Sequence, residues 1–143
     1  MLLSELEIEL MEAISDLNIE DKVQKFTGEE KERILFKLQD KFVDGNPRVW
    51  WLALKHKPTS FIFERQDPYK EIVKFFDKEE EVWFVIEDEF NANEQILYKT
   101  KILYVIDIIE ENYTYFEYNI ISENYDRFLC QTDHDEILFI DLR

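Results

Sequence analysis

Apolar residues in the first forty positions recur at helical spacing. Between residues 4 and 17 they stand three or four apart, which predicts a helix, and Ser4 with Glu7 forms a capping box at its start. A second capping pattern begins at Thr27, so a second helix is predicted to run to about Phe42. The residues expected on its buried face are Ile34, Leu35, Leu38 and Phe42.

Short apolar runs separated by turn residues fill the middle of the chain. Residues 49–54 fit a buried strand or a short helical turn, and periodicity does not separate the two. Asp67-Pro68 predicts a helix start. Residues 100–111 favour a helix, with a β-branched strand as the rival interpretation. Strands are predicted at residues 61–63, 81–87 and 96–98. The tryptophans expected in the core are Trp50, Trp51 and Trp83.

The last thirty residues predict three strands joined by short turns, which means antiparallel hairpins. These strands are residues 113–122, 127–132 and 136–142. Helices first and hairpins last predict an α+β fold, with N-terminal helices packed on one face of a mostly antiparallel sheet. No repeat or linker interrupts the chain, so residues 1–143 are predicted to form a single domain.

The other face of this sheet is expected to be partly open. In the strand 113–122, Tyr115, Glu117, Asn119 and Ile121 should share one face, opposite Phe116, Tyr118 and Ile120. A half-polar, aromatic face of this kind would serve as a docking surface.

The net charge of the chain excludes some classes of binding partner. The chain has 33 acidic and 17 basic residues and a net charge of -16. Such a field repels nucleic acid and anionic membranes and attracts basic proteins. The first residues lack a basic leader, and no uncharged apolar run reaches membrane-spanning length. A lone cysteine, Cys130, excludes an intrachain disulfide. These features predict a cytoplasmic protein that binds neither nucleic acid nor membrane.

Most of the negative charge lies near the two ends of the chain. In the first predicted helix, Glu5, Glu9, Glu12 and Asp16 recur at helical spacing. Adjacent like charges cost a helix roughly 0.2–0.5 kcal/mol per pair, so this stripe is either a solvated face or a docking surface for a basic partner. The second candidate patch is Asp133, Asp135 and Glu136. If the two ends meet in space, they form one concentrated acidic surface.

Sequence motifs for catalysis or metal binding are weak. His134 stands among acidic residues that are metal-ligand types, but consecutive residues point in different directions, which favours a hairpin turn. Cys130 and His134 would be a conceivable nucleophile and base, yet Cys130 is expected inside a strand as a core residue. Glycine-rich phosphate loops and the common hydrolase and zinc motifs are missing. We therefore expect no catalytic residue, metal or cofactor.

Aromatic and turn spacing gives the chain a family resemblance. The segments that carry it are Val49-Trp50-Trp51-Leu52, residues 81–88, residues 117–122 and residues 128–135. This pattern resembles a family of small uncharacterised bacterial cytosolic proteins that often end in W-L-x-C-E-N-H-H-D and are similar in size and charge to immunity proteins that neutralise toxins. Phe128 stands where tryptophan is usual, and only His134 and Asp135 remain of the final motif. The resemblance implies a fold and a compartment rather than an activity.

Three hypotheses of function follow. The leading one is a non-enzymatic acidic protein that binds a basic protein partner, such as an immunity-type inhibitor of a basic bacterial toxin. The first alternative is a small hydrolase or metal-dependent enzyme built on the open sheet face around Tyr115, Glu117, Tyr118 and His134. The second is a regulatory or assembly domain that self-associates through exposed aromatic residues.

Overall fold

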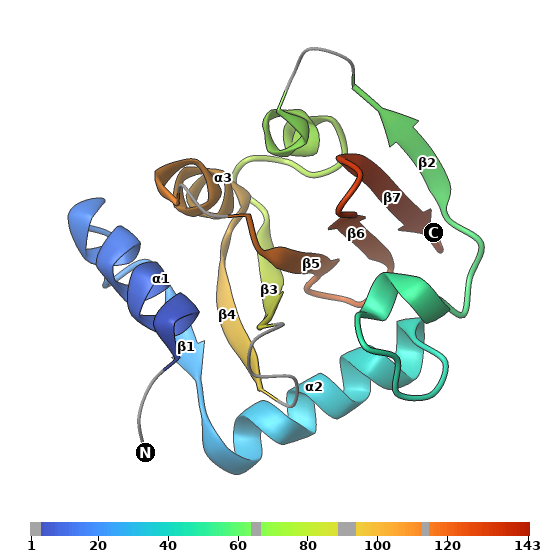
Figure 1. Cartoon of the computed structure of the whole chain (residues 1–143), viewed down its shortest axis with the longest axis horizontal. Helices are drawn as coiled ribbons and strands as arrows, with labels where there is room; N and C mark the ends of the chain where they lie inside the picture. Colours follow the sequence, from blue (N-terminus) through green and yellow to red (C-terminus); the bar gives the residue numbers. More distant parts are fainter. Residues whose placement is uncertain (1–3, 64–66, 89–93, 113–114) are drawn as a thin grey trace.

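A seven-stranded antiparallel sheet organises the chain (Figure 1). The computed structural model describes residues 4–63, 67–88, 94–112 and 115–143. The strand order is β1-β4-β3-β5-β6-β7-β2. The elements are α1 (Glu5–Asp16), β1 (Gln24–Phe26), α2 (Gly28–Phe42), η1 (Trp50–Ala53), β2 (Thr59–Ile62), η2 (Pro68–Lys74), β3 (Glu81–Glu87), β4 (Gln95–Lys101), α3 (Ile102–Glu111), β5 (Glu117–Ser122), β6 (Arg127–Gln131) and β7 (Glu136–Asp141).

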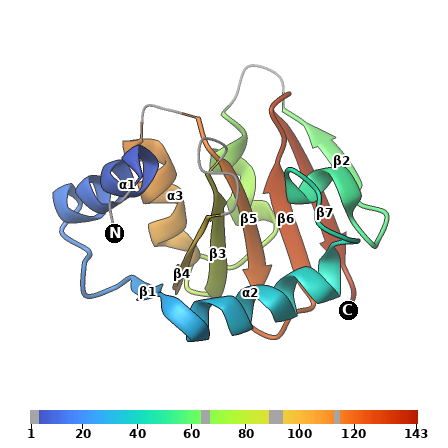
Figure 2. The ribbon, with the colours of Figure 1, turned by 60° about the horizontal axis from the view of Figure 1, so that its bottom comes forward.

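Both faces of the sheet are covered. On one face, Phe84 packs in a core shared with α1, α3 and the 3₁₀ helix η2. On the other face, Trp83 and Val85 pack with α2 and the 3₁₀ helix η1. Because successive strand residues point to opposite faces, the two cores lie on either side of one sheet. Figure 2 shows α2 running across the strands on the side opposite α1 and α3.

The α+β class, the antiparallel sheet and the mainly N-terminal helices are confirmed. The expected pair of layers is wrong, because helices pack on both faces and give three layers. The expectation of a partly open face fails for the same reason. All six residues of β5 are buried, including the polar Glu117 and Asn119. The half-polar face predicted as a docking surface is therefore inside the protein, under α2 and η1.

The first two helices follow their predicted boundaries closely. The Ser4 side chain accepts a hydrogen bond of 3.1 Å from the Glu7 backbone N–H, as the capping box requires. All four residues predicted for the inner face of α2 are buried. Thr27 precedes α2, but its side chain makes no capping hydrogen bond. The boundaries of these two helices can therefore be predicted from local amphipathic spacing.

Short elements differ more from prediction. Residues 50–53 form the 3₁₀ helix η1, which resolves the open choice between strand and turn. The helix begun by Pro68 is also 3₁₀, and its Val73 is 41% exposed. Thr100 and Lys101 extend β4, and the helix predicted from residue 100 begins at Ile102. The three-residue strand β1 was not predicted, because it is too short to show a period.

Strand predictions in the second half of the chain hold, with ends that differ by a few residues. The predicted strand 81–87 has the bounds of β3, and the last three strands match β5, β6 and β7. Cys130 is fully buried in β6, as expected. In the part of the chain that the structure describes, the helices are all too short or too polar to cross a membrane.

Candidate functional site

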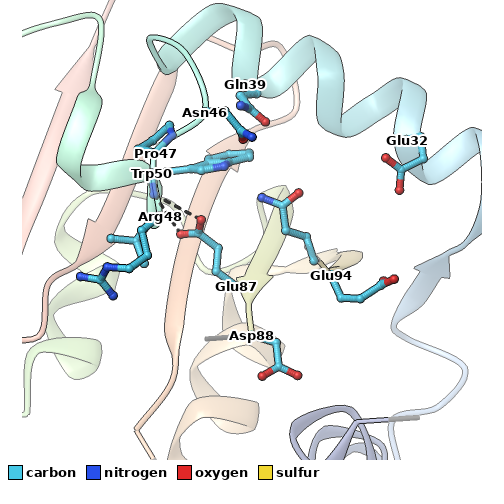
Figure 3. A pocket seen from close by; sticks show the side chains of 11 residues that line it. Glu32, Gln39, Asn46, Pro47, Arg48, Trp50, Glu87, Asp88 and Glu94 are labelled. Carbon is cyan, nitrogen blue, oxygen red and sulfur yellow. Dashed lines mark hydrogen bonds between the residues drawn. The ribbon is translucent and has the colours of Figure 1, made fainter. Parts of the chain in front are cut away.

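A pocket of about 400 Å³ opens where α2 passes the end of β3 (Figure 3). The segment before η1 and the start of β4 complete its wall. We call it the α2–β3 pocket. Its lining residues are Glu32, Gln39, Asn46, Pro47, Arg48, Val49, Trp50, Glu87, Asp88, Glu94 and Gln95. This size falls in the range usual for ligand sites.

Glu87, the last residue of β3, is the best-fixed group in the pocket wall. It is buried, with 8% of its surface exposed. The Trp50 backbone N–H lies 3.2 and 3.3 Å from the two carboxylate oxygens, and Asn119 Nδ2 donates at 3.0 Å. Trp50 begins η1, where backbone N–H groups have no partner within the helix. The carboxylate thus satisfies a helix start and is itself held in one position.

Burial changes the acidity of Glu87. Loss of solvation raises its pKa to about 7, and the neighbouring Glu117 adds to the rise. The hydrogen bonds from Asn119 and Trp50, together with the charge of Arg48, act in the opposite direction. Burial destabilises the charged form of Glu87 by more than these contacts stabilise it, because the buried carboxylate is poorly solvated. Glu87 therefore changes its charge near neutral pH.

A second buried carboxylate lies beside Glu87 on the neighbouring strand. Glu117 of β5 pairs in register with Glu87 and accepts a 3.1 Å hydrogen bond from Trp51 Nε1. Burial, helped by the charges of these two glutamates, raises the pKa of the Cys130 thiol well above its ordinary value. A thiol that stays protonated is a poor nucleophile. The chemistry of this cluster thus favours a core role for Cys130 over catalysis.

The rim of the α2–β3 pocket is acidic. Glu32 and Glu94 are exposed, whereas Glu87 and Asp88 are buried in the wall. Lys31 lies outside the lining, with its ammonium 3.5 Å from Glu94 Oε2 and 3.0 Å from the Gln95 carbonyl. The lining itself contains four acidic residues and a single base, Arg48. Its charge therefore favours a cationic group.

The first acidic set from the sequence lies on the outward side of α1. Glu5, Glu9, Glu12 and Asp16 are all exposed. Within the described ranges, none of these four carboxylates forms an ion pair. Two apolar side chains of the same helix are also exposed, Ile8 at 43% and Met11 at 44%. We call these six residues the α1 face.

The second acidic set lies in the turn between β6 and β7. Asp133 and Asp135 are exposed, and Glu136 accepts a hydrogen bond from Ser60 of the neighbouring strand β2. The α1 helix lies beside β1 and β4, at the other end of the sheet, as both ribbon views show. The expected single acidic surface is therefore wrong, since the two sets occupy opposite sides of the molecule.

His134 lies in this turn. Its side chain is 83% exposed, and its Nε2 lies 3.5 Å from an oxygen of Asp133. A search of the described residues found no group of three or more histidine, cysteine or acidic side chains able to hold a metal ion. Antiparallel pairing of β6 with β7 across residues 132–135 confirms the hairpin turn predicted here.

The residues suggested for an enzyme on the sheet face lie on both sides of the sheet. Glu117 is buried beneath Trp51, on the α2 side of the sheet. Tyr118 points to the opposite face, where its hydroxyl donates to Gln131 Oε1 at 2.6 Å. Tyr115 is 47% exposed, and its hydroxyl lies 3.4 Å from the Gln131 carbonyl oxygen. Burial and contact with Glu117 raise the pKa of the Tyr115 phenol, and His134 lies in the exposed turn that follows β6.

The α2–β3 pocket could not be predicted from local sequence, because its wall comes from four separate segments. The one local signal was Glu87-Asp88 directly after an apolar strand. A polar pair in that position also fits an ordinary strand end. Only the strand order, which brings β3 beside β5, shows that Glu87 is buried next to Glu117.

Comparisons with known proteins give the relationship of the chain but no activity. Searches of curated proteins and of solved structures found no match. A family model of unknown function, DUF6756, matches residues 3–142, nearly the whole chain. With that coverage, the chain belongs to the DUF6756 family.

Proposed function

We propose that this protein is a non-enzymatic binding protein whose partner is a basic protein, and that the α1 face is its docking surface. The observation that carries the proposal is the exposure of Ile8 and Met11 beside four carboxylates that form no ion pair within the described ranges. An apolar centre with charged surroundings is the usual make-up of a protein interface.

The geometry of the helix supports a common surface. Ile8 follows Glu5 by three residues and precedes Glu12 by four, so the three side chains are neighbours on α1. Asp16 lies in the last turn, where the helix dipole disfavours a negative charge. A partner that brings lysine or arginine to this face would relieve both the mutual repulsion and the unfavourable dipole contact.

An immunity-type role fits this surface. Toxins that bind nucleic acid carry basic clefts, and an acidic inhibitor would associate with such a cleft quickly because opposite fields steer the encounter. Ile8 and Met11 would then supply the apolar contact that slows dissociation. The net charge of -16 also favours association with a basic partner.

The test is capture of partners from a lysate of the native host at low salt, where attraction between opposite charges is strongest. The wild type is compared with a quadruple variant, E5Q/E9Q/E12Q/D16N. The control carries the same change in charge on scattered exposed acids, D67N/E79Q/E111Q/E123Q. Captured proteins are identified by mass spectrometry and then produced in pure form to measure Kd.

The proposal expects a basic protein that binds the wild type and the control but binds the α1 variant at least about tenfold more weakly, from several charge contacts worth 0.2–1 kcal/mol each. A further variant, I8S/M11S, keeps every charge and should also weaken binding. Equal loss in the α1 variant and in its charge-matched control would show only a non-specific effect of net charge. Capture of no basic protein would refute the proposal.

A further inference from the structure

We infer that the α2–β3 pocket receives a lysine or arginine side chain of the partner, as a second contact separate from the α1 face. This inference rests on the proposed function for the nature of the partner, namely a basic protein. It rests on the pocket itself for the place and chemistry of the contact. Neither the family match nor the α1 face assigns any role to this pocket.

The pocket has suitable dimensions and lining for such a side chain. A volume of about 400 Å³ accommodates an arginine side chain with solvent. Pro47, Val49 and Trp50 supply apolar wall for the methylene groups. The amide side chains of Gln39 and Asn46 line the same cavity and add hydrogen-bond acceptors. This mixture suits a long side chain with an apolar stem and a charged, donor-rich end.

Glu87 gives the pocket a carboxylate that is already in place. Its hydrogen bonds to the Trp50 backbone and the Asn119 side chain fix its position before any ligand arrives. An ion pair formed there does not have to order a flexible acid, and reduced solvent strengthens it. Glu87 and Asp88 are the buried carboxylates of the lining, while Glu32 and Glu94 form the exposed rim.

Arg48 provides a test of whether the ligand is a cation or an anion. It is the one base in the lining, and Figure 3 shows it on one side of the pocket with Glu32 and Glu94 on the other. A cationic side chain is attracted to the carboxylates and repelled by Arg48. An anionic ligand would depend on Arg48 instead. Removal of this arginine therefore changes affinity in opposite directions for the two kinds of ligand.

Phe36 indicates that the occupant belongs to a macromolecule. It is 72% exposed on α2, four residues after Glu32 and three before Gln39. Residues at these intervals are neighbours on a helix surface, so an exposed aromatic ring lies next to two residues of the pocket wall. Aromatic residues beside a pocket are frequent energetic centres of protein interfaces. A free small molecule seated in the cavity would leave this ring uncovered.

The experiment is an NMR titration of the ¹⁵N-labelled full chain with N-acetyl-arginine N-methylamide, at pH 8 and low salt. This probe carries only the side-chain charge. Its matched control is the citrulline analogue, which has nearly the same shape without the charge. We expect shifts in the backbone amides of residues 46, 48–50, 87–88 and 94–95 with the arginine probe. The citrulline probe should bind at least about tenfold more weakly, because it lacks the charge of an ion pair at a partly buried site.

Four variants sharpen the result. Glu32→Gln and Glu94→Gln remove exposed rim carboxylates and should each weaken the arginine probe about two- to fivefold. Glu29→Gln, an exposed acid in the first turn of the same helix, should leave the affinity within about twofold, since its charge is solvated and outside the pocket. Arg48→Gln should tighten binding. These positions are exposed, so the fold should tolerate all four changes.

The outcomes separate this inference from the proposed function. Shifts that are absent, equal for both probes, or weakened by Arg48→Gln would overturn the pocket assignment, whatever the lysate capture gives. Much tighter binding of agmatine than of the blocked arginine would assign the pocket to a free polyamine and also overturn it. If the arginine probe binds but no basic protein is captured, the pocket chemistry holds and the proposed function fails. Once a partner is in hand, Phe36→Ala should reduce its affinity while leaving the probe affinity unchanged.

Discussion

The two faces of the sheet use the same strands for different purposes. Under α1 and α3, strand β3 contributes Val82, Phe84 and Ile86 to a continuous apolar core. Under α2, the same strand contributes Trp83 and Val85 and then Glu87, which is a buried charge beside a pocket. On the first face, β3 thus makes only apolar contacts. On the second face, apolar contacts are replaced at the end of β3 by Glu87 and the α2–β3 pocket.

The largest effect should come from the apolar face. Phe84→Ala removes a fully buried ring whose neighbours include Tyr98, Phe116 and Tyr118. We expect a loss of about 3–5 kcal/mol in the free energy of unfolding, from lost burial plus a cavity. Urea unfolding measures it. Phe36→Ala, at an exposed ring, should stay within about 0.5 kcal/mol of the wild type. Similar costs for both would contradict the described core.

The next effect belongs to the polar face and depends on pH. Glu87 has a pKa of about 7 when folded, against 4.5 when unfolded. Below pH 4.5 the group is protonated in both states and costs nothing. Between pH 4.5 and 7 the unfolded state loses its proton first, so stability falls as the pH rises, and the full cost is present above pH 7. At roughly 1.4 kcal/mol per pKa unit, that cost is about 3 kcal/mol.

Glu87→Gln should therefore be more stable than the wild type at pH 8, by up to about 3 kcal/mol, and similar to it near pH 4.5. Urea unfolding of both proteins across this pH range gives the difference. Both proteins share the other acidic residues, so the difference isolates position 87. A constant offset between the two curves would contradict the raised pKa of Glu87.

A smaller effect should follow from loss of the Trp51 hydrogen bond. Trp51→Phe removes the N–H donor to the buried Glu117 carboxylate, and we expect a cost of about 1–3 kcal/mol at neutral pH. Trp83→Phe is the matched change on the same face. The indole N–H of Trp83 has no hydrogen-bond partner among the described residues, so this variant should lose packing and part of the Lys99 cation–π contact but no hydrogen bond. Thermal unfolding compares them. An unchanged Tm for Trp51→Phe would show that the hydrogen bond from Trp51 to Glu117 does not stabilise the fold.

The smallest predicted effect compares the two helices that cover opposite faces. Ser4→Ala removes the side-chain cap of α1 and should cost about 1 kcal/mol. Thr27→Ala, at the same position of α2, should cost clearly less, because the Thr27 side chain makes no capping hydrogen bond. Urea midpoints of the two single variants are sufficient. Equal losses would show that the helix starts behave alike in solution.

The parts of the fold that were predictable are those fixed by local spacing. The inner face of α2 and the bounds of β3 follow from apolar periods within a dozen residues. By contrast, η1 is held by the contact of Trp50 with Glu87, which is distant in sequence. The number of layers also depends on where helices pack, and no window of sequence contains that information. Both faces of β3 and β5 are buried, which reflects the helices on either side of the sheet.

The candidate site divides in the same way. Exposure of Glu5, Glu9, Glu12 and Asp16 was predictable from helical spacing, and the structure agrees. Their separation from Asp133, Asp135 and Glu136 was not, because it depends on the order of strands in the sheet. The α2–β3 pocket was missed for a related reason. Its carboxylates look like ordinary surface and strand-end residues until tertiary structure gathers them.

The position of β2 at the sheet edge has a consequence for synthesis of the chain. Thr59–Ile62 pairs with β7, near the end of the sequence, and β7 is its one neighbour in the sheet as described. On the ribosome, β2 emerges long before β7 exists, whereas β3, β4 and β5 follow one another closely. The nascent protein therefore carries an unpaired strand, with Phe61 not yet packed against the core, until residues 136–141 have been synthesised. Chaperone contacts during synthesis should concentrate on this segment.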